Sequence, residues 1–251
     1  MNETFKDIQE YFNWYKTVYG DSLRFDGDLS LPERTIASEK VNPVKIAQPE
    51  PVAEPVKKLR FDENLIHQNN LQLKKFYHEI NNCEKCALGK TRQNFVFGMG
   101  NPTADLMFIG EAPGQEEDLK GLPFVGRAGQ LLDKMLFAMK LKRDEVYIAN
   151  ILKCRPPNNR DPLPDEVSKC EPYLKKQIEM IGPKVIVALG RISAQVLLKK
   201  SDPLSALRRD THYYEKIPFI VTYHPAALLR NPRWKSNAWD DLQKLKSFFS
   251  F

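Results

Sequence analysis

The chain has 251 residues, of which 42% are hydrophobic, and a formal net charge of +6. This length suits one good-sized domain with an appendage. No run approaches the roughly 18 apolar residues that a membrane span needs, and residues 1–7 lack the basic-then-apolar pattern of a signal peptide. We therefore expect a soluble, cytoplasmic protein and exclude the membrane and secreted classes.

The basic charge is concentrated after residue 60. Residues 1–60 carry 9 Lys and Arg against 10 Asp and Glu, whereas residues 61–251 carry 29 against 22. A moderately basic domain suits a phosphate-bearing partner. A lysine-rich surface that serves only solubility is at least as common, so charge alone does not decide the partner.

The first 60 residues are predicted to form an appendage. Apolar side chains recur at helical spacing over residues 5–19, which predicts an amphipathic helix that Gly20 can end. The following stretch is rich in proline, and prolines at this density sustain neither a helix nor a sheet. We expect a helical extension over 1–29, a flexible linker over 30–60 and a folded domain over 61–251.

Helical and strand patterns alternate along this domain. The predicted helices cover 64–80, 126–140, 164–181, 192–198 and 237–249, and the predicted strands cover 106–109, 145–151, 184–189 and 217–223. The strands are continuous rather than alternating apolar runs, which is typical of a parallel sheet buried on both faces. We therefore predict an α/β fold, a three-layer αβα sandwich around a central, mostly parallel four-stranded sheet.

In such a sheet, functional residues gather where strands end at their carboxyl side. Four segments qualify, namely 110–126, 150–164, 190–191 and 224–230. The first begins with Gly-Glu-Ala-Pro-Gly, a turn that presents backbone N–H groups and one carboxylate at the sheet edge. Taken alone, this stretch is explained equally well as an ordinary tight turn.

Three side chains in these segments suit a flat heterocycle. Phe124 can stack on a nucleobase, and the amide of Asn150 offers a donor and an acceptor to the edge of a pyrimidine. A neutral His224 can donate to an oxygen on which charge develops. Each also has a plainer explanation, because phenylalanines fill cores, asparagines form turns and histidines cap helices.

Four cysteines form a second candidate site. Cys83 and Cys86 make a Cys-x2-Cys pair, and Cys154 and Cys170 follow in a loop and in the helix after it. Reducing compartments keep thiols reduced, and grouped thiolates bind zinc or iron–sulfur clusters. Unrelated buried thiols would not explain the Cys-x2-Cys pair. The spacing does not distinguish zinc from a 4Fe-4S cluster.

Together these segments resemble the family-4 uracil-DNA glycosylases, the iron–sulfur branch of that superfamily. The resemblance covers residues 70–250 and rests on Gly-Glu-Ala-Pro-Gly at 110–114, Pro-Phe-Val-Gly-Arg-Ala-Gly at 123–129, Asn150, His-Pro-Ala-Ala-Leu-Leu-Arg at 224–230 and the cysteine spacing. It implies a monofunctional DNA-repair enzyme that flips uracil out of DNA and hydrolyses its N-glycosidic bond, leaving an abasic site.

The resemblance also implies roles for single residues. Phe124 would stack on uracil, Asn150 would read its polar edge, and Glu117 would exclude a thymine methyl. His224 would hydrogen-bond uracil O2, and Glu111 would assist the attacking water. The other implied roles are a pocket floor at Gly110, Ala112 and Gly114, DNA contacts at Leu228 (as a wedge in the vacated stack) and Arg230, and a structural 4Fe-4S cluster on Cys83, Cys86, Cys154 and Cys170.

Two features bear on the mechanism. Ala112 replaces the aspartate that orients water in the best-known branch of the superfamily, an absence that family-4 members share, so Glu111 or nearby backbone groups are expected to assist water. Between Asn150 and Cys170 there is no Arg/His-rich insertion of the kind that traps product covalently in a related branch. We therefore expect turnover.

Two other functions fit parts of the sequence. A non-catalytic DNA-binding or replication-associated module would keep the fold and the cluster, with residues 1–60 as a tether to a replication or repair protein. A zinc-binding α/β hydrolase of small nucleotides would use the same loops. Activity on uracil-containing DNA, and iron rather than zinc, would separate these from the main prediction. We expect a monomer without a membrane partner.

Overall fold

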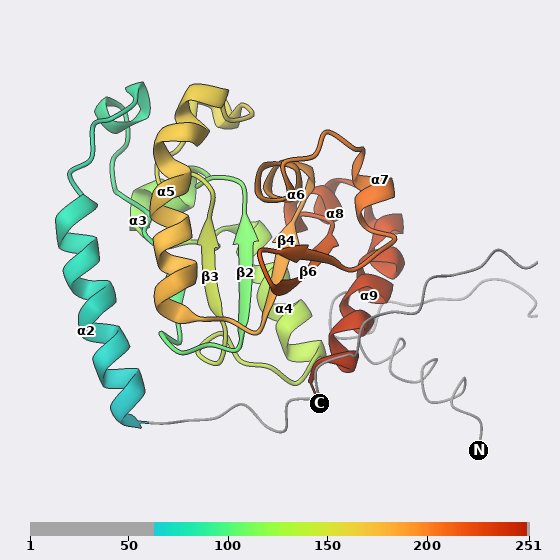
Figure 1. Cartoon of the computed structure of the whole chain (residues 1–251). Helices are drawn as coiled ribbons and strands as arrows, with labels where there is room; N and C mark the ends of the chain where they lie inside the picture. The colour runs from blue at the N-terminus through green and yellow to red at the C-terminus, as the bar shows by residue number, and fades with distance from the viewer. Residues whose placement is uncertain (1–62, 250–251) are drawn as a thin grey trace, which may run out of the picture.

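The computed structural model of the chain describes residues 63–249 (Figure 1). The helix predicted over residues 5–19 and the proline-rich linker lie outside these residues. Within them, helices and a sheet alternate, and the predicted α/β class is confirmed. None of the described helices is long and apolar enough to cross a membrane.

A six-stranded sheet forms the middle of the domain, with the strand order β1-β3-β2-β4-β6-β5. Its strands are β1 (Met99–Gly100), β2 (Leu106–Gly110), β3 (Tyr147–Asn150), β4 (Val185–Leu189), β5 (His212–Tyr214) and β6 (Ile217–Thr222). The four central strands are parallel, whereas β1 and β5 pair antiparallel at the edges. The predicted four strands are this parallel centre, and the prediction of four in total is wrong by the two edge strands.

The edge strands are too short to produce a sequence pattern. Strand β1 has two residues, and Gly98 and Gly100 have φ angles of 145° and 135°, which glycine adopts without strain. A Cβ on Gly100 would overlap the carbonyl oxygen of Val146, so the close approach of β1 to β3 requires glycine there. From the sequence alone, glycines at these two positions predict a turn rather than a strand, which is why β1 was not predicted.

Helices cover both faces of the sheet (Figure 1). They are α2 (Glu63–Ile80), α3 (Gln115–Lys120), α4 (Arg127–Ala138), α5 (Pro164–Ile181), α6 (Arg191–Leu198), α7 (Leu204–Leu207), α8 (Pro225–Arg230) and α9 (Lys235–Gln243), with 3-10 turns η1 (Ala87–Lys90), η2 (Pro157–Asn159), η3 (Pro232–Trp234) and η4 (Lys244–Ser247). The helix predicted over 237–249 is thus divided between α9 and η4.

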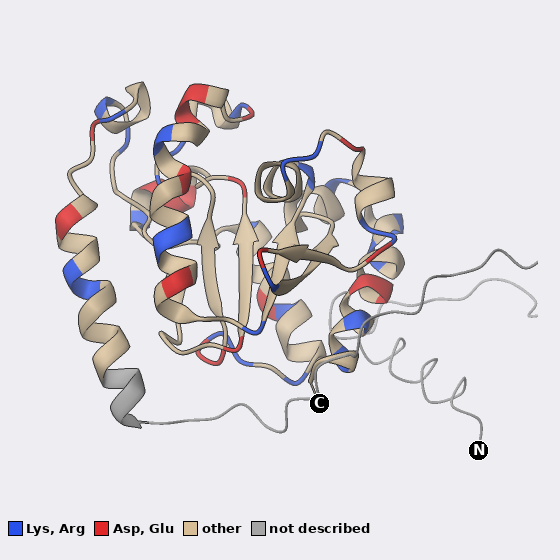
Figure 2. Cartoon of the chain, in the orientation of Figure 1, with Lys and Arg blue, Asp and Glu red and all other residues tan. Residues whose placement is uncertain are grey.

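Alternation along the central strands creates two cores. Met107 and Ile109 of β2 belong to a core that α2, α5, α6 and α7 close, whereas Leu106 and Phe108 belong to a core that α4, α8 and α9 close. This is the predicted three-layer αβα sandwich. Strands β2 and β3 carry no charged residue, and the charges lie on the helices and connecting loops (Figure 2).

Helix α5 shows how local signals fix the edge of the sheet. Its start is marked by Pro164 and by the carboxylate of Glu166, which accepts a 2.8 Å hydrogen bond from the Leu163 N–H. Arg160 binds the same carboxylate at 2.9 and 2.6 Å. The helix ends at Gly182, whose φ of 62° is left-handed. The loop before α5 is therefore tied down beside the strand ends.

Candidate active site

A pocket of about 320 Å³ opens at the carboxyl edge of the parallel strands. Eight of the residues predicted from the sequence line it: Glu111, Ala112, Gly114, Glu117, Phe124, Asn150, His224 and Arg230. They come from the segments after β2, β3 and β6. The segment after β4 joins them, because a Cβ on Gly190 would lie 3.0 Å from His224 Cβ and Arg191 pairs with Asp161 at 2.8 Å. All four predicted segments therefore meet.

Gly110, the last residue of β2, supports two of the pocket side chains from below. A Cβ at this position would overlap Asn150 Oδ1 and lie 2.6 Å from Phe124 Cζ. Both side chains would have to move to admit it. The absence of a side chain at Gly110 is thus what lets the amide and the aromatic ring occupy the pocket together.

Phe124 is held in a strained conformation. Its φ is 52°, in the left-handed region that residues with a side chain rarely adopt, and its side chain is 5% exposed. The loop is fixed by Glu117, whose Oε1 accepts hydrogen bonds of 2.8 and 2.9 Å from the N–H groups of Val125 and Gly126. The Phe124 ring lies 5.4 Å from the ring of His224, tilted by 33°.

Asn150 presents a buried amide without a complete set of partners. Its side chain is 2% exposed, and Oδ1 has no hydrogen-bond donor among the described residues. Leaving such a group unpaired costs about 1–3 kcal/mol. A cost of this size at the wall of a pocket is accounted for by a ligand that supplies the missing donor.

His224 is held as a neutral ring that donates from Nε2. It caps the start of α8, where Nδ1 accepts a 3.2 Å hydrogen bond from the Ala226 N–H. A neutral imidazole that accepts at Nδ1 carries its proton on Nε2. Burial, with a smaller contribution from the Arg230 charge, lowers the pKa of His224 to about 4. At pH 7 the ring therefore offers an N–H donor without a net charge.

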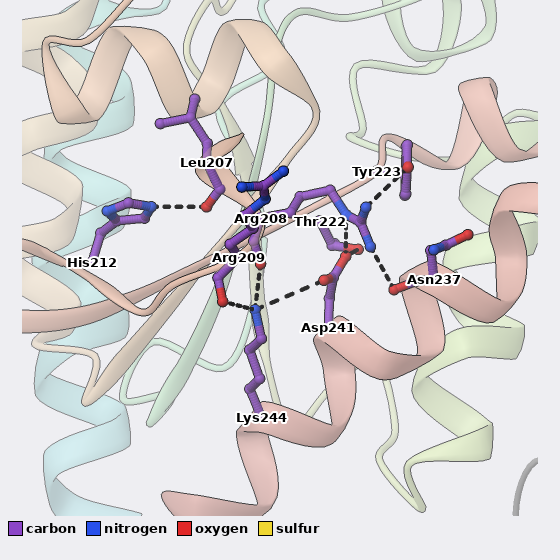
Figure 3. A network of polar contacts seen from close by, with 9 residues as sticks. All are labelled: Leu207, Arg208, Arg209, His212, Thr222, Tyr223, Asn237, Asp241 and Lys244. Atoms are coloured by element: carbon purple, nitrogen blue, oxygen red, sulfur yellow. Dashed lines mark hydrogen bonds and ion pairs between the residues drawn. The ribbon is translucent and has the colours of Figure 1, made fainter. Parts of the chain in front are cut away.

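A polar network anchors the end of β6 just before His224 (Figure 3). Asp241 of α9 accepts a 2.8 Å hydrogen bond from Thr222 Oγ1 and pairs with Arg208 Nε at 2.6 Å. Arg208 also donates to the hydroxyl of Tyr223 at 2.9 Å. Thr222 and Asp241 are buried, so these contacts are shielded from water. The strand end that delivers His224 is therefore fixed from the neighbouring helix.

Glu111 is a carboxyl group poised between its two ionisation states. Burial raises its pKa to about 7; the carboxylate of Asp161 also raises it, and Arg191 opposes the shift. No hydrogen bond from the described residues reaches the Glu111 carboxylate. A carboxyl group that titrates near neutral pH in a pocket is suited to accept a proton from water.

A family model described as the uracil DNA glycosylase superfamily matches residues 97–243. The chain belongs to the uracil-DNA glycosylase superfamily. The type-4 uracil-DNA glycosylase of Archaeoglobus fulgidus is 49% identical over 175 residues, which are 66% of this chain and 88% of that protein. Those of Sulfurisphaera tokodaii and Saccharolobus solfataricus are 45% and 46% identical, over 69% and 68% of this chain and 83% and 84% of theirs.

These relatives confirm the resemblance to the type-4 branch, and with it the predicted class, a DNA-repair glycosylase. The site of this uracil-DNA glycosylase also contains residues that the sequence patterns did not single out. Pro156, Asn159, Arg160 and Asp161 line the pocket from the loop after β3. The available signal was the Asn-Asn pair at 158–159, because asparagine tolerates the left-handed turn conformation that both residues adopt, with φ angles of 55° and 53°.

One predicted DNA contact, Leu228, is buried in this structure. Leu228 is 0% exposed and packs in the core that α4, α8 and α9 close, so it does not stand ready as a wedge. The reason is that residues 225–230 form a helix, which turns Leu228 inward. The next residue, Leu229, is 37% exposed, and Arg230 is exposed at the mouth of the pocket.

The four cysteines gather on the sheet face that α2 and α5 cover. All four contribute to the same core, Cys154 and Cys170 as buried residues and Cys83 and Cys86 as partly buried ones. Donors surround the sulfurs: Arg92 Nη1 lies 3.5 Å from Cys154 Sγ, the Lys153 N–H lies 3.3 Å from Cys170 Sγ, and the Tyr173 hydroxyl lies 3.3 Å from Cys83 Sγ.

The sulfurs influence one another electrostatically. Burial raises the pKa of Cys154 to about 11 and that of Cys170 to about 12, and neighbouring cysteines raise both further, while Arg92 and Lys153 act in the opposite sense. No three His, Cys, Asp or Glu side chains in the described part of the chain converge closely enough to hold a single metal ion. Protonated thiols are the expected state until a metal centre replaces the protons.

Proposed function

We propose that the chain hydrolyses the N-glycosidic bond of deoxyuridine in DNA, with His224 as the group that stabilises the departing base. The observation that carries this proposal is the neutral ring of His224, which lines the pocket and whose Nδ1 accepts from the Ala226 N–H, so that Nε2–H is the donor of the ring. Cleavage leaves negative charge on uracil, and a fixed donor aimed at that charge lowers the barrier.

Recognition of uracil is assigned to three side chains. Phe124 stacks on the ring, and the unpaired amide of Asn150 reads the polar edge. Glu117 serves as a wall against the thymine methyl. Its two backbone hydrogen bonds support this role, because a steric filter must not yield. Extruding the base from a duplex costs a few kcal/mol, which these contacts offset.

Water activation is assigned to Glu111. As the glycosidic bond breaks, the sugar gains oxocarbenium character and the base leaves as an anion that His224 holds. Ionised Glu111 accepts a proton from the water that attacks the sugar. Ala112 beside it has no group that can do this. Arg230, which lines the pocket, and the exposed Leu229 next to it are proposed to contact the DNA near the flipped nucleotide.

The cysteines are proposed to hold a 4Fe-4S cluster. Four thiols on one side of a core, with Arg92 and Lys153 as nearby cations, suit a cluster with several thiolate charges. Cys83 and Cys86 after α2, Cys154 after β3 and Cys170 on α5 would hold the cluster, which would cross-link these three segments. No step of the hydrolysis passes through it.

Oligonucleotides with a single uracil or thymine, single- and double-stranded, test the proposal. The parent chain should release uracil and leave alkali-labile abasic sites. Removing the donor with His224→Ala should slow this about 10²- to 10³-fold, and Asn150→Ala should slow it as well, without loss of folding. His212→Ala, which removes a histidine outside the pocket, is the matched control. Full activity of both pocket variants would show that the site is misassigned.

A further inference from the structure

Lys153 contacts both candidate sites from a fully buried position. Its side chain is 0% exposed, and Nζ donates to the Asn150 carbonyl oxygen at 3.0 Å and to Gln177 Oε1 at 2.6 Å. Its own N–H lies 3.3 Å from Cys170 Sγ, and the next residue along the chain is Cys154. Lys153 therefore lies between Asn150, which is proposed to bind the pyrimidine edge, and the cysteines Cys154 and Cys170.

The surroundings of Lys153 are built to receive its ammonium group. Gln177 is also 0% exposed, and its Nε2 donates to the Phe97 carbonyl at 3.1 Å and to the Tyr147 hydroxyl at 3.4 Å. These two contacts turn the amide oxygen toward Lys153. Two acceptors are thus fixed in advance, one on α5 and one at the end of β3.

The charge of Lys153 lacks a carboxylate partner. Among the described residues, no Asp or Glu forms an ion pair with it, although an unpaired buried charge is unfavourable. Its nearest candidate partners are the sulfurs of the proposed cluster ligands, since its N–H lies 3.3 Å from Cys170 Sγ and Cys154 follows it in the chain.

We propose that Lys153 is a positioning residue that couples the cysteine centre to the uracil pocket. Its charge stabilises the thiolates that hold the cluster, and its two hydrogen bonds fix the end of β3 that carries the Asn150 amide. This inference rests on the proposed roles of the cysteines and of Asn150. It gives a structural cluster a consequence for the pocket, because the residue that contacts Cys170 and precedes Cys154 also donates hydrogen bonds to Asn150 and to Gln177 of α5.

Two substitutions separate the charge from the hydrogen bonds. Lys153→Met fills the space with an apolar chain and removes both, whereas Lys153→Gln removes the charge but keeps an amide N–H that can reach toward Asn150. Lys200→Met, on an exposed lysine after α6, is the matched control. For each full-length chain we would measure iron and sulfide per chain, the rate at which a chelator bleaches the visible absorbance, thermal unfolding, and kcat and KM on uracil-containing DNA.

Both Lys153 variants should lose the cluster to the chelator about 10- to 100-fold faster than the parent, the size expected when a group supporting metal ligands is removed. Lys153→Met should also lower kcat/KM more than Lys153→Gln does, at equal cluster content. Parent-like bleaching in both variants would overturn the inference. If Lys153→Met fails to fold, Lys153→Gln still decides. An inactive parent would overturn the proposed function alone, since bleaching is measured without DNA.

Discussion

Two carboxylates on the segment after β2, Glu111 and Glu117, both line the pocket but have opposite surroundings. Glu117 accepts hydrogen bonds from the N–H groups of Val125 and Gly126 and thereby holds the Phe124 loop. Glu111 has no such donor from the described residues, and burial raises its pKa to about 7. The two hydrogen bonds commit the Glu117 carboxylate to a structural task. The Glu111 carboxyl group, which has no such donors among the described residues, stays available to exchange a proton.

In the proposed mechanism, Glu117 therefore supports the pocket and Glu111 takes part in the chemistry. The same division recurs on α8, where Leu228 packs in the core and Leu229 faces outward. Neighbouring residues of one type have different tasks because the backbone directs them to different environments. The variants below exchange or remove one member of each pair.

Glu111→Gln gives the largest expected effect. The amide cannot take a proton from water, so uracil release should slow about 10²- to 10⁴-fold at pH 8, where Glu111 is ionised. In the parent, the rate should rise with pH and level off above a pKa near 7, because the ionised form is the active one. This rising limb should disappear in Glu111→Gln. Rates from pH 5 to 9 on a uracil oligonucleotide measure both features.

Glu117→Gln is the control for that experiment, because an amide oxygen can still accept from Val125 and Gly126. It should keep the rising limb and most of the rate. If Glu117→Gln lost activity as completely as Glu111→Gln and flattened the same limb, the division between the two carboxylates would be wrong.

Glu117→Ala should have a smaller effect of a different kind. Without its acceptor, the loop is free to relax the left-handed conformation of Phe124, and a misplaced stacking ring lowers kcat/KM for uracil about 10- to 100-fold. The space vacated by the carboxylate should also admit a methyl group. Thymine release that is detectable in this variant and absent in the parent would support the wall; unchanged discrimination would exclude it.

The pocket could be assembled from the sequence because each of its strand ends carries its own signal. The Gly-rich turn after β2, Asn150 as the last residue of β3 and His224 after β6 stand at the ends of apolar runs, and a parallel sheet brings such positions together. The separate tasks of Glu111 and Glu117 could not be predicted in this way. They depend on which backbone N–H groups the Phe124 loop turns toward a carboxylate, and a left-handed phenylalanine leaves no sequence pattern.

The contacts between separate loops could not be predicted from the sequence either. Asp161 lines the pocket next to Arg160, which pairs with Glu166 at the start of α5, and it pairs with Arg191, the first residue of α6. Lys153 reads as one lysine in an apolar stretch, and its full burial follows from acceptors that come from β3 and α5. Such residues acquire their roles from tertiary partners rather than from spacing.

The Asp161–Arg191 pair should tune Glu111 in predictable directions. Asp161→Asn removes a negative charge that raises the pKa of Glu111 and leaves Arg191 unpaired, so the rising limb should move to lower pH. The rate at pH 6 should then increase about two- to threefold, because a larger fraction of Glu111 is ionised at that pH. Arg191→Met should move the limb to higher pH. Because both side chains are largely exposed, 1 M salt should weaken both shifts. Shifts of the same sign would contradict the assignment.

The α8 pair gives the smallest expected effect on chemistry and the clearest separation of support from contact. Leu228→Ala leaves a cavity in the core and should lower the free energy of unfolding by about 2–5 kcal/mol, while the activity per folded molecule stays close to the parent's.

Leu229→Ala should leave stability nearly unchanged. If the exposed Leu229 side chain fills the vacated stack, this variant should stabilise the flipped-out base less, by a few kcal/mol at most. Uracil release should then be slower from double-stranded but not from single-stranded DNA. Denaturant unfolding and paired single- and double-strand rates measure the two effects. A duplex defect in Leu228→Ala with normal stability would show instead that α8 unwinds on DNA and turns Leu228 outward.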